Sequence, residues 1–175
     1  MPEFIDDEDF GSYFETFDHT AWRLETRRGY ASDRVSEKFH RWSESGVLPD
    51  DSHRPWCRNV RRQTAAGKRI ERVRLVDTPL TPEQRYLLAS AKANNAAGED
   101  IRTLRRDEAD RLRLGSEDFW LFDACRALVL HFDKADEYLG AELVTDLARV
   151  VRFCQLRDAA WHFAIPHEAL ATEAQ

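Results

Sequence analysis

Three closely spaced apolar segments constrain the fold of this chain more than any other feature. The segments cover residues 118–123, 127–132 and 138–144. Their short connections favour an antiparallel meander at the centre of one sheet. Along the first segment both alternating sets of side chains are apolar, with Phe119 and Leu121 on one side and Trp120 and Phe122 on the other. Such a sheet must be covered on both faces, so we expect the flanking helices to pack against it.

A β-α-β unit is predicted before the meander. Thr81 can cap a helix with Pro82 in its first position, and Gln84 completes a capping box. Gly98 is typical of a helix end. The strands on either side of this helix are predicted at residues 70–76 and 101–104.

The remaining elements indicate a mixed fold. We predict helices at residues 8–17, 33–45, 55–64 and 147–165, and a strand at residues 21–26. Asp33 is the expected cap of the second of these helices. With 175 residues, the chain is expected to form one domain, 1–175. Its predicted class is α+β, a mixed α/β sandwich with a mixed sheet of about six strands that contains the meander (118–144) and has helices packed on its faces.

Two of the predicted strands carry charged side chains at alternate positions. Arg23 and Glu25 stand on one side of the first strand, which is the pattern of a half-exposed edge strand. Arg72 and Arg74 stand on one side of the second, and we expect both to point outward.

The formal net charge of −6 conceals a strong asymmetry. Residues 1–20 contain Asp and Glu but neither Lys nor Arg, whereas residues 54–74 contain one acidic residue, Glu71, among many Arg and Lys. Two interpretations remain open. The charged segments are either separate solvated faces, or an acidic arm and a basic segment that meet within one molecule or between two.

A basic face is the most concentrated feature with functional character. Its members are Arg54, Arg58, Arg61 and Arg62 on one predicted helix, extended by Arg72 and Arg74. Arginine clusters bind phosphate and carboxylate groups, so nucleic acid, a phosphorylated ligand or an acidic protein surface could each use this face. The sequence pI of about 5.5 argues against nucleic-acid binding by the chain alone.

The acidic segment also carries an aromatic stripe. Phe10, Tyr13, Phe14 and Phe17 follow the spacing i, i+3, i+4, i+7 of one helix face. This much apolar surface must be buried, either on the sheet of the same chain or on a partner or second copy. We interpret residues 1–18 as an acidic aromatic interaction arm.

Catalytic candidates are few. His131 could act as a general base if Asp123 or Glu142 oriented its ring, although the spacing is unspecific and favours a structural histidine at a strand end. We find no nucleophile elbow, phosphate loop or metal-ligand spacing, and three cysteines without CxxC spacing indicate reduced thiols. We therefore expect no metal and no cofactor.

Residues 1–17 lack the basic and apolar regions of a leader peptide, and no apolar stretch approaches the roughly 20 residues that a membrane span requires. The sequence thus predicts a cytoplasmic protein with no membrane partner.

Five segments together resemble a family of small actinobacterial proteins that contain a domain of unknown function. The segments are residues 39–42, 73–81, 97–102, 118–123 and 157–161. Members of that family are often encoded beside helix-turn-helix regulators. The resemblance spans nearly the whole chain, and it implies no catalytic residue.

The stretch from Val73 to Trp161 also resembles the C-terminal half of phospholipase D-like domains. That superfamily uses the motif His-x-Lys-x4-Asp, whereas here His131 is followed by Phe132, Asp133 and Lys134, which places the lysine one position too late. The resemblance therefore implies a shared scaffold without the phosphodiesterase site.

The sequence favours a non-enzymatic cytoplasmic accessory or regulatory protein that acts through protein contacts, with a helix-turn-helix transcription regulator as a candidate partner. Two alternatives remain. One is a small hydrolase or transferase that uses His131 with a nearby carboxylate, and the other is nucleic-acid binding through the Arg54 to Arg74 face. A homodimer is also left open.

Overall fold

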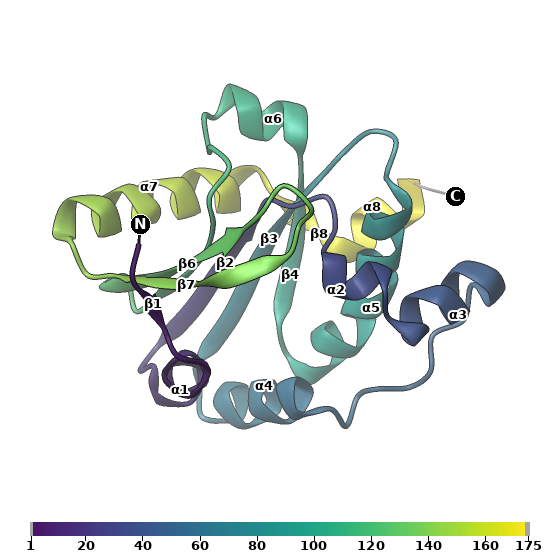
Figure 1. The fold of residues 1–175 in the computed structure, drawn as a ribbon, viewed down its shortest axis with the longest axis horizontal. Helices are drawn as coiled ribbons and strands as arrows, with labels where there is room; N and C mark the ends of the chain where they lie inside the picture. The colour runs from purple at the N-terminus through teal and green to yellow at the C-terminus, as the bar shows by residue number, and fades with distance from the viewer. Residues whose placement is uncertain (1, 174–175) are drawn as a thin grey trace.

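The computed structural model of the protein describes residues 2–173, and for 171–173 only the backbone. The elements in chain order are β1 (Phe4–Ile5), α1 (Asp7–Thr16), β2 (Thr20–Glu25), α2 (Ala31–Arg34), α3 (Glu37–Ser45), α4 (Pro55–Ala65), β3 (Arg69–Val76), α5 (Pro82–Ala97), β4 (Asp100–Arg105), α6 (Arg106–Arg111), β5 (Asp118–Phe122), β6 (Arg126–Phe132), β7 (Tyr138–Val144), α7 (Leu147–Phe163), β8 (Ile165–Pro166) and α8 (His167–Glu173) (Figure 1). Within this part of the chain, no helix has the length and apolar character needed to cross a membrane.

The strands form one mixed sheet in the order β1-β7-β6-β5-β2-β3-β4-β8. Strands β2, β3 and β4 are parallel neighbours, and the other pairs are antiparallel. This confirms the meander β5-β6-β7 and the unit β3-α5-β4. The expected number of about six strands was too low, since the sheet has eight. The two extra strands, β1 and β8, lie at the edges and have two residues each, which is too short for a periodic signal.

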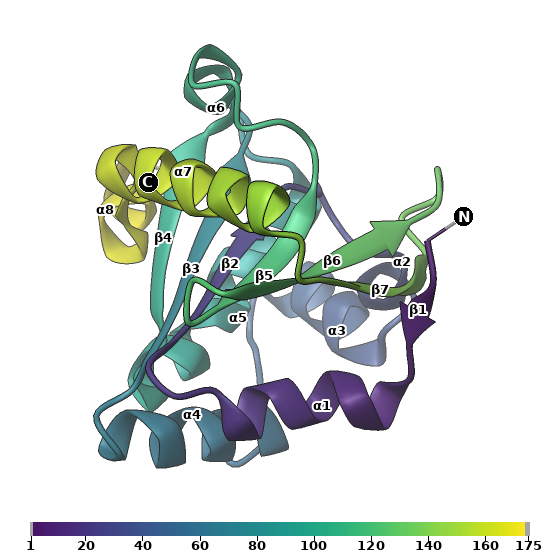
Figure 2. The same ribbon diagram turned by 90° about the vertical axis from the view of Figure 1, so that its left-hand side faces the viewer.

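Helix α7 covers one face of the sheet (Figure 2). It buries Val150, Phe153 and Leu156 against side chains that include Trp22 and Phe119, and the rings of Phe119 and Phe153 lie 4.3 Å apart. Asp146 caps the helix by accepting a hydrogen bond from the Arg149 N–H. The predicted helix at the end of the meander is therefore confirmed as the cover of this face.

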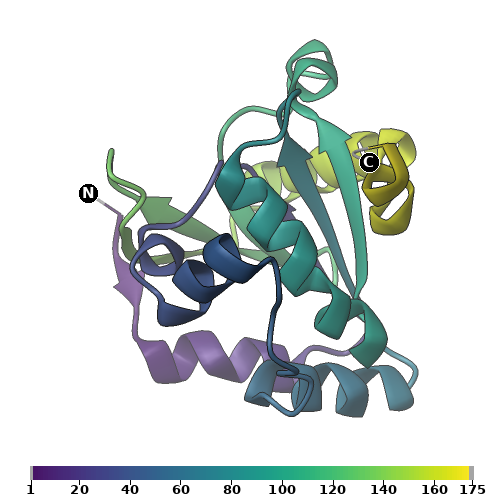
Figure 3. The same ribbon diagram turned by 90° about the vertical axis from the view of Figure 1, so that its right-hand side faces the viewer.

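Helices α1, α4 and α5 cover the other face (Figure 3). Phe14 of α1, Phe17 at the end of that helix and Val60 of α4 are buried there against Trp120 and Phe122 of β5. The prediction that both faces of the meander are covered is confirmed, because the two core clusters take alternate residues of the same strand β5.

The aromatic stripe of residues 8–17 packs within its own molecule. Phe14 and Phe17 are buried, and Phe10 and Tyr13 are half-buried against the same core cluster. The apolar side of α1 is thus occupied by its own sheet, whereas Asp7, Glu8 and Asp9 in its first turn stay exposed.

The starts of two helices test the N-caps predicted from the sequence. The predicted capping box at Thr81 and Gln84 is present. The helix expected from Asp33 to residue 45 is instead two helices, α2 and α3, because Ser36 starts a new helix by accepting a hydrogen bond from the Phe39 N–H at 3.1 Å. The predicted cap at Asp33 was wrong, because Asp33 lies inside α2, whose N-cap position is Tyr30, and Ser36 caps α3.

Truncation of a central core residue gives a direct test of this packing. Leu121 on β5 is fully buried, so Leu121→Ala should lower the free energy of unfolding by about 2–5 kcal/mol. Val151→Ala is the matched control, since Val151 is 54% exposed on α7. Urea unfolding that shows equal, small changes for both variants would contradict the assignment.

Candidate functional site

The central parallel strands place charged residues on the face covered by α5. Arg23 and Glu25 of β2 stand beside Arg72 and Arg74 of β3, because the strand register pairs Arg23 with Arg72 and Glu25 with Arg74. Nearer the amino ends of both strands the same face is apolar, with Ala21 and Ile70 in the core. This face of the sheet therefore changes from apolar to charged along the strands.

The structure contradicts the prediction that Arg72 and Arg74 point outward. Only 8% of Arg72 and 3% of Arg74 is exposed. The expectation failed because β3 is an inner strand with helices on both faces, so alternate residues face two covered sides and none faces water. Strand β2 was likewise expected at an edge, and it lies between β5 and β3.

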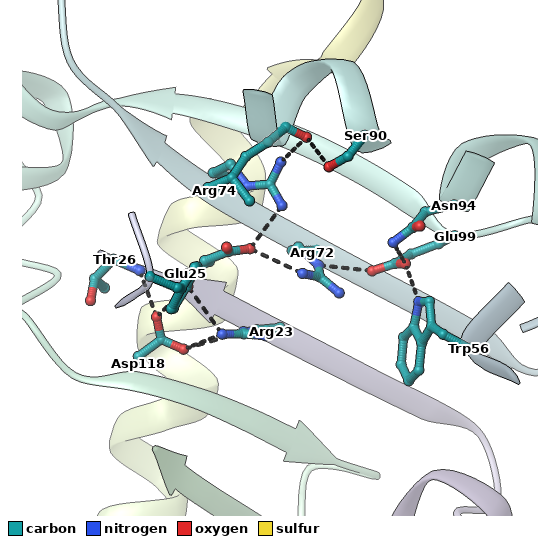
Figure 4. A network of polar contacts seen from close by, with 12 residues as sticks. Arg23, Glu25, Thr26, Trp56, Arg72, Arg74, Ser90, Asn94, Glu99 and Asp118 are labelled. Atoms are coloured by element: carbon teal, nitrogen blue, oxygen red, sulfur yellow. Dashed lines mark hydrogen bonds and ion pairs between the residues drawn. The ribbon is translucent and has the colours of Figure 1, made fainter. Parts of the chain in front are cut away.

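Carboxylates from three different parts of the chain neutralise these arginines (Figure 4). Glu25 Oε2 accepts hydrogen bonds from Arg72 Nη1 at 3.0 Å and Arg74 Nη2 at 3.1 Å. Glu99 Oε1 accepts from Arg72 Nε at 2.8 Å. Asp118 Oδ1 accepts from Arg23 Nη2 at 2.9 Å. Three guanidinium groups and three carboxylates thus form a buried ion-pair network without net charge.

Hydrogen bonds with neutral groups complete the network. Trp56 Nε1 of α4 and Asn94 Nδ2 of α5 each donate to Glu99 Oε2 at 2.8 Å. The Thr26 N–H donates to Asp118 Oδ2 at 3.0 Å, and Arg74 Nη1 donates to the Leu87 carbonyl at 2.9 Å. The network therefore ties helices α4 and α5 to the sheet by directional bonds as well as by apolar packing.

Electrostatics keep the central groups charged. Burial alone would raise the pKa of Glu25, but Arg74, Arg23 and Arg72 hold it well below its ordinary value. Burial opposes the charge of Arg23, and Asp118 nevertheless raises the pKa of that guanidinium. Burial and the nearby Glu25 carboxylate raise the pKa of Asp118, against the opposing attraction of Arg23.

A cavity of about 300 Å³ opens over this network on the side of α1, α4 and α5. The residues that line it are Phe10, Phe14, Arg23, Trp56, Arg72, Asn94, Trp120 and Leu130. The guanidinium carbons of Arg23 and Arg72 lie 5.7 and 5.4 Å from the centre of the Trp120 ring, which places them within cation-π range. Aromatic rings and buried cations therefore meet in one hollow.

The residues of the predicted basic face do not form one surface, because some are exposed and others are buried. Arg58, Arg61 and Arg62 are exposed on α4. Arg54 is half-buried and donates to Asp51 at 2.8 Å and to Asn94. Since Arg72 and Arg74 are also buried, half of the six predicted basic residues remain on the surface.

The acidic and basic segments meet within one molecule. Helices α1 and α4 lie side by side (Figures 2 and 3), and Arg62 Nη2 lies 3.8 Å from Glu15 Oε1. Both side chains are more than 60% exposed, so this ion pair contributes little to stability.

The three catalytic candidates do not form one site. His131 Nε2 lies 3.0 Å from Glu142 Oε2, and Glu142 Oε1 accepts from Arg149 Nη1 at 2.6 Å. The hydrogen bond from Arg149 lowers the pKa of Glu142. Asp123 lies in the turn that joins β5 to β6, at the end of the hairpin opposite to His131. Neither His131 nor Glu142 lines the aromatic cavity.

Asp123 has a structural task of its own. Its carboxylate accepts hydrogen bonds from the backbone N–H groups of Asp18, His19 and Thr20, at 2.7 to 2.9 Å. It also lines a separate polar cavity of about 620 Å³ beside Trp22 and Trp161. Within residues 2–173, no three His, Cys, Asp or Glu side chains are grouped as metal ligands.

Sequence reasoning missed the residues that build the network and the cavity. The sequence places Asp118 at the start of the first apolar segment, Glu99 just before the predicted strand at 101–104 and Trp56 in the predicted helix at 55–64, and none of these positions indicates an ion-pair network. The one usable signal was charge inside strongly apolar strands, since Arg23 and Glu25 alternate with Trp22 and Leu24. Charges in such strands are rarely buried unless they are paired.

These observations define a mixed α/β protein with a self-neutralised ion-pair network beneath an aromatic cavity. The chain belongs to the family described as Domain of unknown function (DUF6879), whose model matches residues 8–172. The resemblance to a family with a domain of unknown function is thereby confirmed. A comparison with curated proteins found no match for the chain.

The network predicts a strong response to the loss of one carboxylate. Glu25→Gln should lower the free energy of unfolding at neutral pH by about 3–5 kcal/mol, because it leaves Arg72 and Arg74 without their shared anion. Glu117→Gln is the control, since its carboxylate lies 3.7 Å from Arg149 on the surface, where such a pair contributes about 0–1 kcal/mol.

The lowered pKa of Glu25 predicts that the effect of this substitution on the free energy of unfolding depends on pH. The pKa of Glu25 in the folded chain lies below its ordinary value of 4.5. The stabilisation from its charge is therefore complete above that value and is lost as the pH falls below it. Chemical unfolding should show the difference between wild type and Glu25→Gln narrowing with acidification. A difference that stays constant from neutral pH to about pH 3 would contradict this assignment.

Proposed function

We propose that the protein is a non-enzymatic cytoplasmic accessory protein that acts through contact with a partner protein. The resemblance of the sequence points to a helix-turn-helix transcription regulator as that partner. One observation carries the proposal, namely the exposed acidic first turn of α1 beside the exposed ring of Tyr138.

The first turn of α1 is an acidic surface held by a packed helix. Within residues 2–173, no ion pair engages Asp7, Glu8 or Asp9, while Phe14 anchors the same helix in the core. Tyr138 is 46% exposed, and the charge of Asp7, together with burial as the larger cause, raises the pKa of its hydroxyl. Unpaired carboxylates beside an exposed ring suit a surface rich in arginine.

The polar groups elsewhere favour a binding role over catalysis. The Glu142 carboxylate of the His131 and Glu142 pair also accepts from Arg149, and neither residue of the pair lines the aromatic cavity. Asp123 is occupied by three backbone N–H groups. The carboxylates closest to the aromatic cavity already accept from guanidinium and indole donors, so none is available as a base.

Charge reversal at α1 tests the proposal. The double variant Asp7→Lys/Glu8→Lys should weaken binding to a helix-turn-helix regulator, the proposed partner, by at least about tenfold, which corresponds to about 1.4 kcal/mol. Isothermal titration calorimetry with both purified proteins measures this change. The thermal melt of the variant should stay within a few degrees of wild type, because the altered side chains are exposed.

The matched control reverses the charges of Asp107 and Asp110, which are exposed on α6 at the other end of the molecule (Figure 1). This control should bind the regulator as wild type does. Absence of wild-type binding, or equal losses in both double variants, would overturn the proposed contact surface.

Nucleic-acid binding has weaker support, because Arg58, Arg61 and Arg62 alone remain of the exposed arginine stripe on α4. We predict no measurable binding to duplex DNA at the physiological salt concentration of about 0.15 M. Any binding at low salt should fall steeply as salt is added. Fluorescence anisotropy with labelled duplexes checks this. Salt-resistant binding that disappears in Arg58→Glu/Arg61→Glu would favour the nucleic-acid function instead.

A further inference from the structure

The cavity over the ion-pair network combines two features that ligand sites share. Its volume of about 300 Å³ lies at the lower end of the range of ~300–1,000 Å³ found for small-molecule pockets. Most of its lining is apolar and aromatic, contributed by Phe10, Phe14, Trp56 and Trp120. Among the described residues that line it, the only charged ones are two arginines from neighbouring strands, Arg23 and Arg72.

Both arginines are held in place by two of their three nitrogens. Arg72 uses Nε and Nη1 to bind Glu99 and Glu25. Arg23 uses Nε and Nη2 to bind Asp118. The planar guanidinium groups are therefore fixed in orientation before any ligand arrives, which lowers the entropic cost of binding.

The third nitrogen of each arginine is free to bind a ligand. Among the described residues, neither Arg72 Nη2 nor Arg23 Nη1 donates to any acceptor, and Figure 4 shows the Arg72 nitrogen without a bond. Neither atom is cut off from solvent, in contrast to the unsatisfied Nε of Arg74. Both residues line the cavity.

The carboxylates of the network do not cancel this attraction for an anion. Glu25, Glu99 and Asp118 are at most 2% exposed, and none of them lines the cavity. Glu99 accepts from three donors, those of Arg72, Trp56 and Asn94, and these three residues line the cavity in its place. The cavity therefore presents cationic donors to its contents and keeps the anions behind them.

We propose that this cavity binds a small ligand in which one carboxylate is attached to a flat aromatic body. The carboxylate accepts from Arg72 Nη2 and Arg23 Nη1, and charge-assisted hydrogen bonds of this kind are among the strongest in proteins. The aromatic body packs on Phe10, Phe14 and Trp56, where ring pairs gain energy beyond their buried area. This proposal does not depend on the partner protein proposed above.

The first test uses wild-type protein, so its outcome does not depend on whether a variant folds. The probes are 2-naphthoate, its uncharged amide and inorganic phosphate, each titrated into the full chain by calorimetry. We expect 2-naphthoate to bind at least about tenfold more tightly than either of the others, a difference of about 1.4 kcal/mol. An amide that binds equally well would overturn the anionic requirement, and phosphate that binds equally well would overturn the aromatic one.

The tryptophan side chains locate the bound probe. The chain has five tryptophans, whose indole N–H signals are resolved in a ¹H–¹⁵N spectrum and assigned by Trp→Phe variants. Binding in this cavity should shift the signals of Trp56 and Trp120 and leave Trp42 unchanged. Shifts confined to Trp22 and Trp161, which line the separate polar cavity, or no shifts at millimolar probe, would overturn the proposed site.

A variant in the wall completes the experiment. Phe10 is half-buried on α1, so Phe10→Ala should leave the chain folded and weaken 2-naphthoate binding about tenfold through lost apolar contact. Phe163→Ala removes an equal side chain that is 48% exposed on α7 and should bind the probe as wild type does. Equal affinities for all three proteins would contradict the aromatic wall.

Discussion

The pairing of Arg72 with Glu25 and Glu99 is the interaction on which the rest of this structure depends. Arg72 lies on an inner strand, and its two carboxylate partners come from the neighbouring strand and from the turn that leads into β4. Through Glu99 the same cluster holds Trp56 of α4 and Asn94 of α5. A buried charge without such partners would cost several kcal/mol, so strand order and helix positions must be correct together.

The network also explains why a cavity exists on this face of the sheet. Helices α1 and α4 pack on the apolar part, where Ala21, Ile70 and Phe122 offer a continuous surface. Where the side chains become long and charged, α5 contacts them through a carbonyl of Leu87 and the amide of Asn94. The hydrogen bonds of a guanidinium group need fixed directions, whereas apolar packing does not. The cavity lies between these two kinds of contact, and both aromatic and guanidinium side chains line it.

The features predicted correctly from the sequence are those encoded locally. The meander and the capping box at Thr81 depend on residues within a few positions of one another, and local patterns specify them. The buried ion pairs join residues far apart in the chain, such as Arg23 with Asp118. The alternation of side chains along a strand predicts that a charged residue faces solvent. Only the order of the strands reveals that neither side of β3 faces water.

Helix α1 connects the two proposed binding surfaces. Phe10 lines the cavity, and Asp7 stands one turn earlier on the exposed side of the same helix. If both proposals hold, a ligand that packs on Phe10 and a partner that binds Asp7 act on one rigid element. Any effect of the ligand on affinity for the partner must then be matched by an equal effect of the partner on affinity for the ligand, because the coupling free energy is reciprocal. Because Asp7 and Phe10 are one turn apart on the same helix, a small shift in the packing of α1 would couple the two surfaces, and no change of fold is needed.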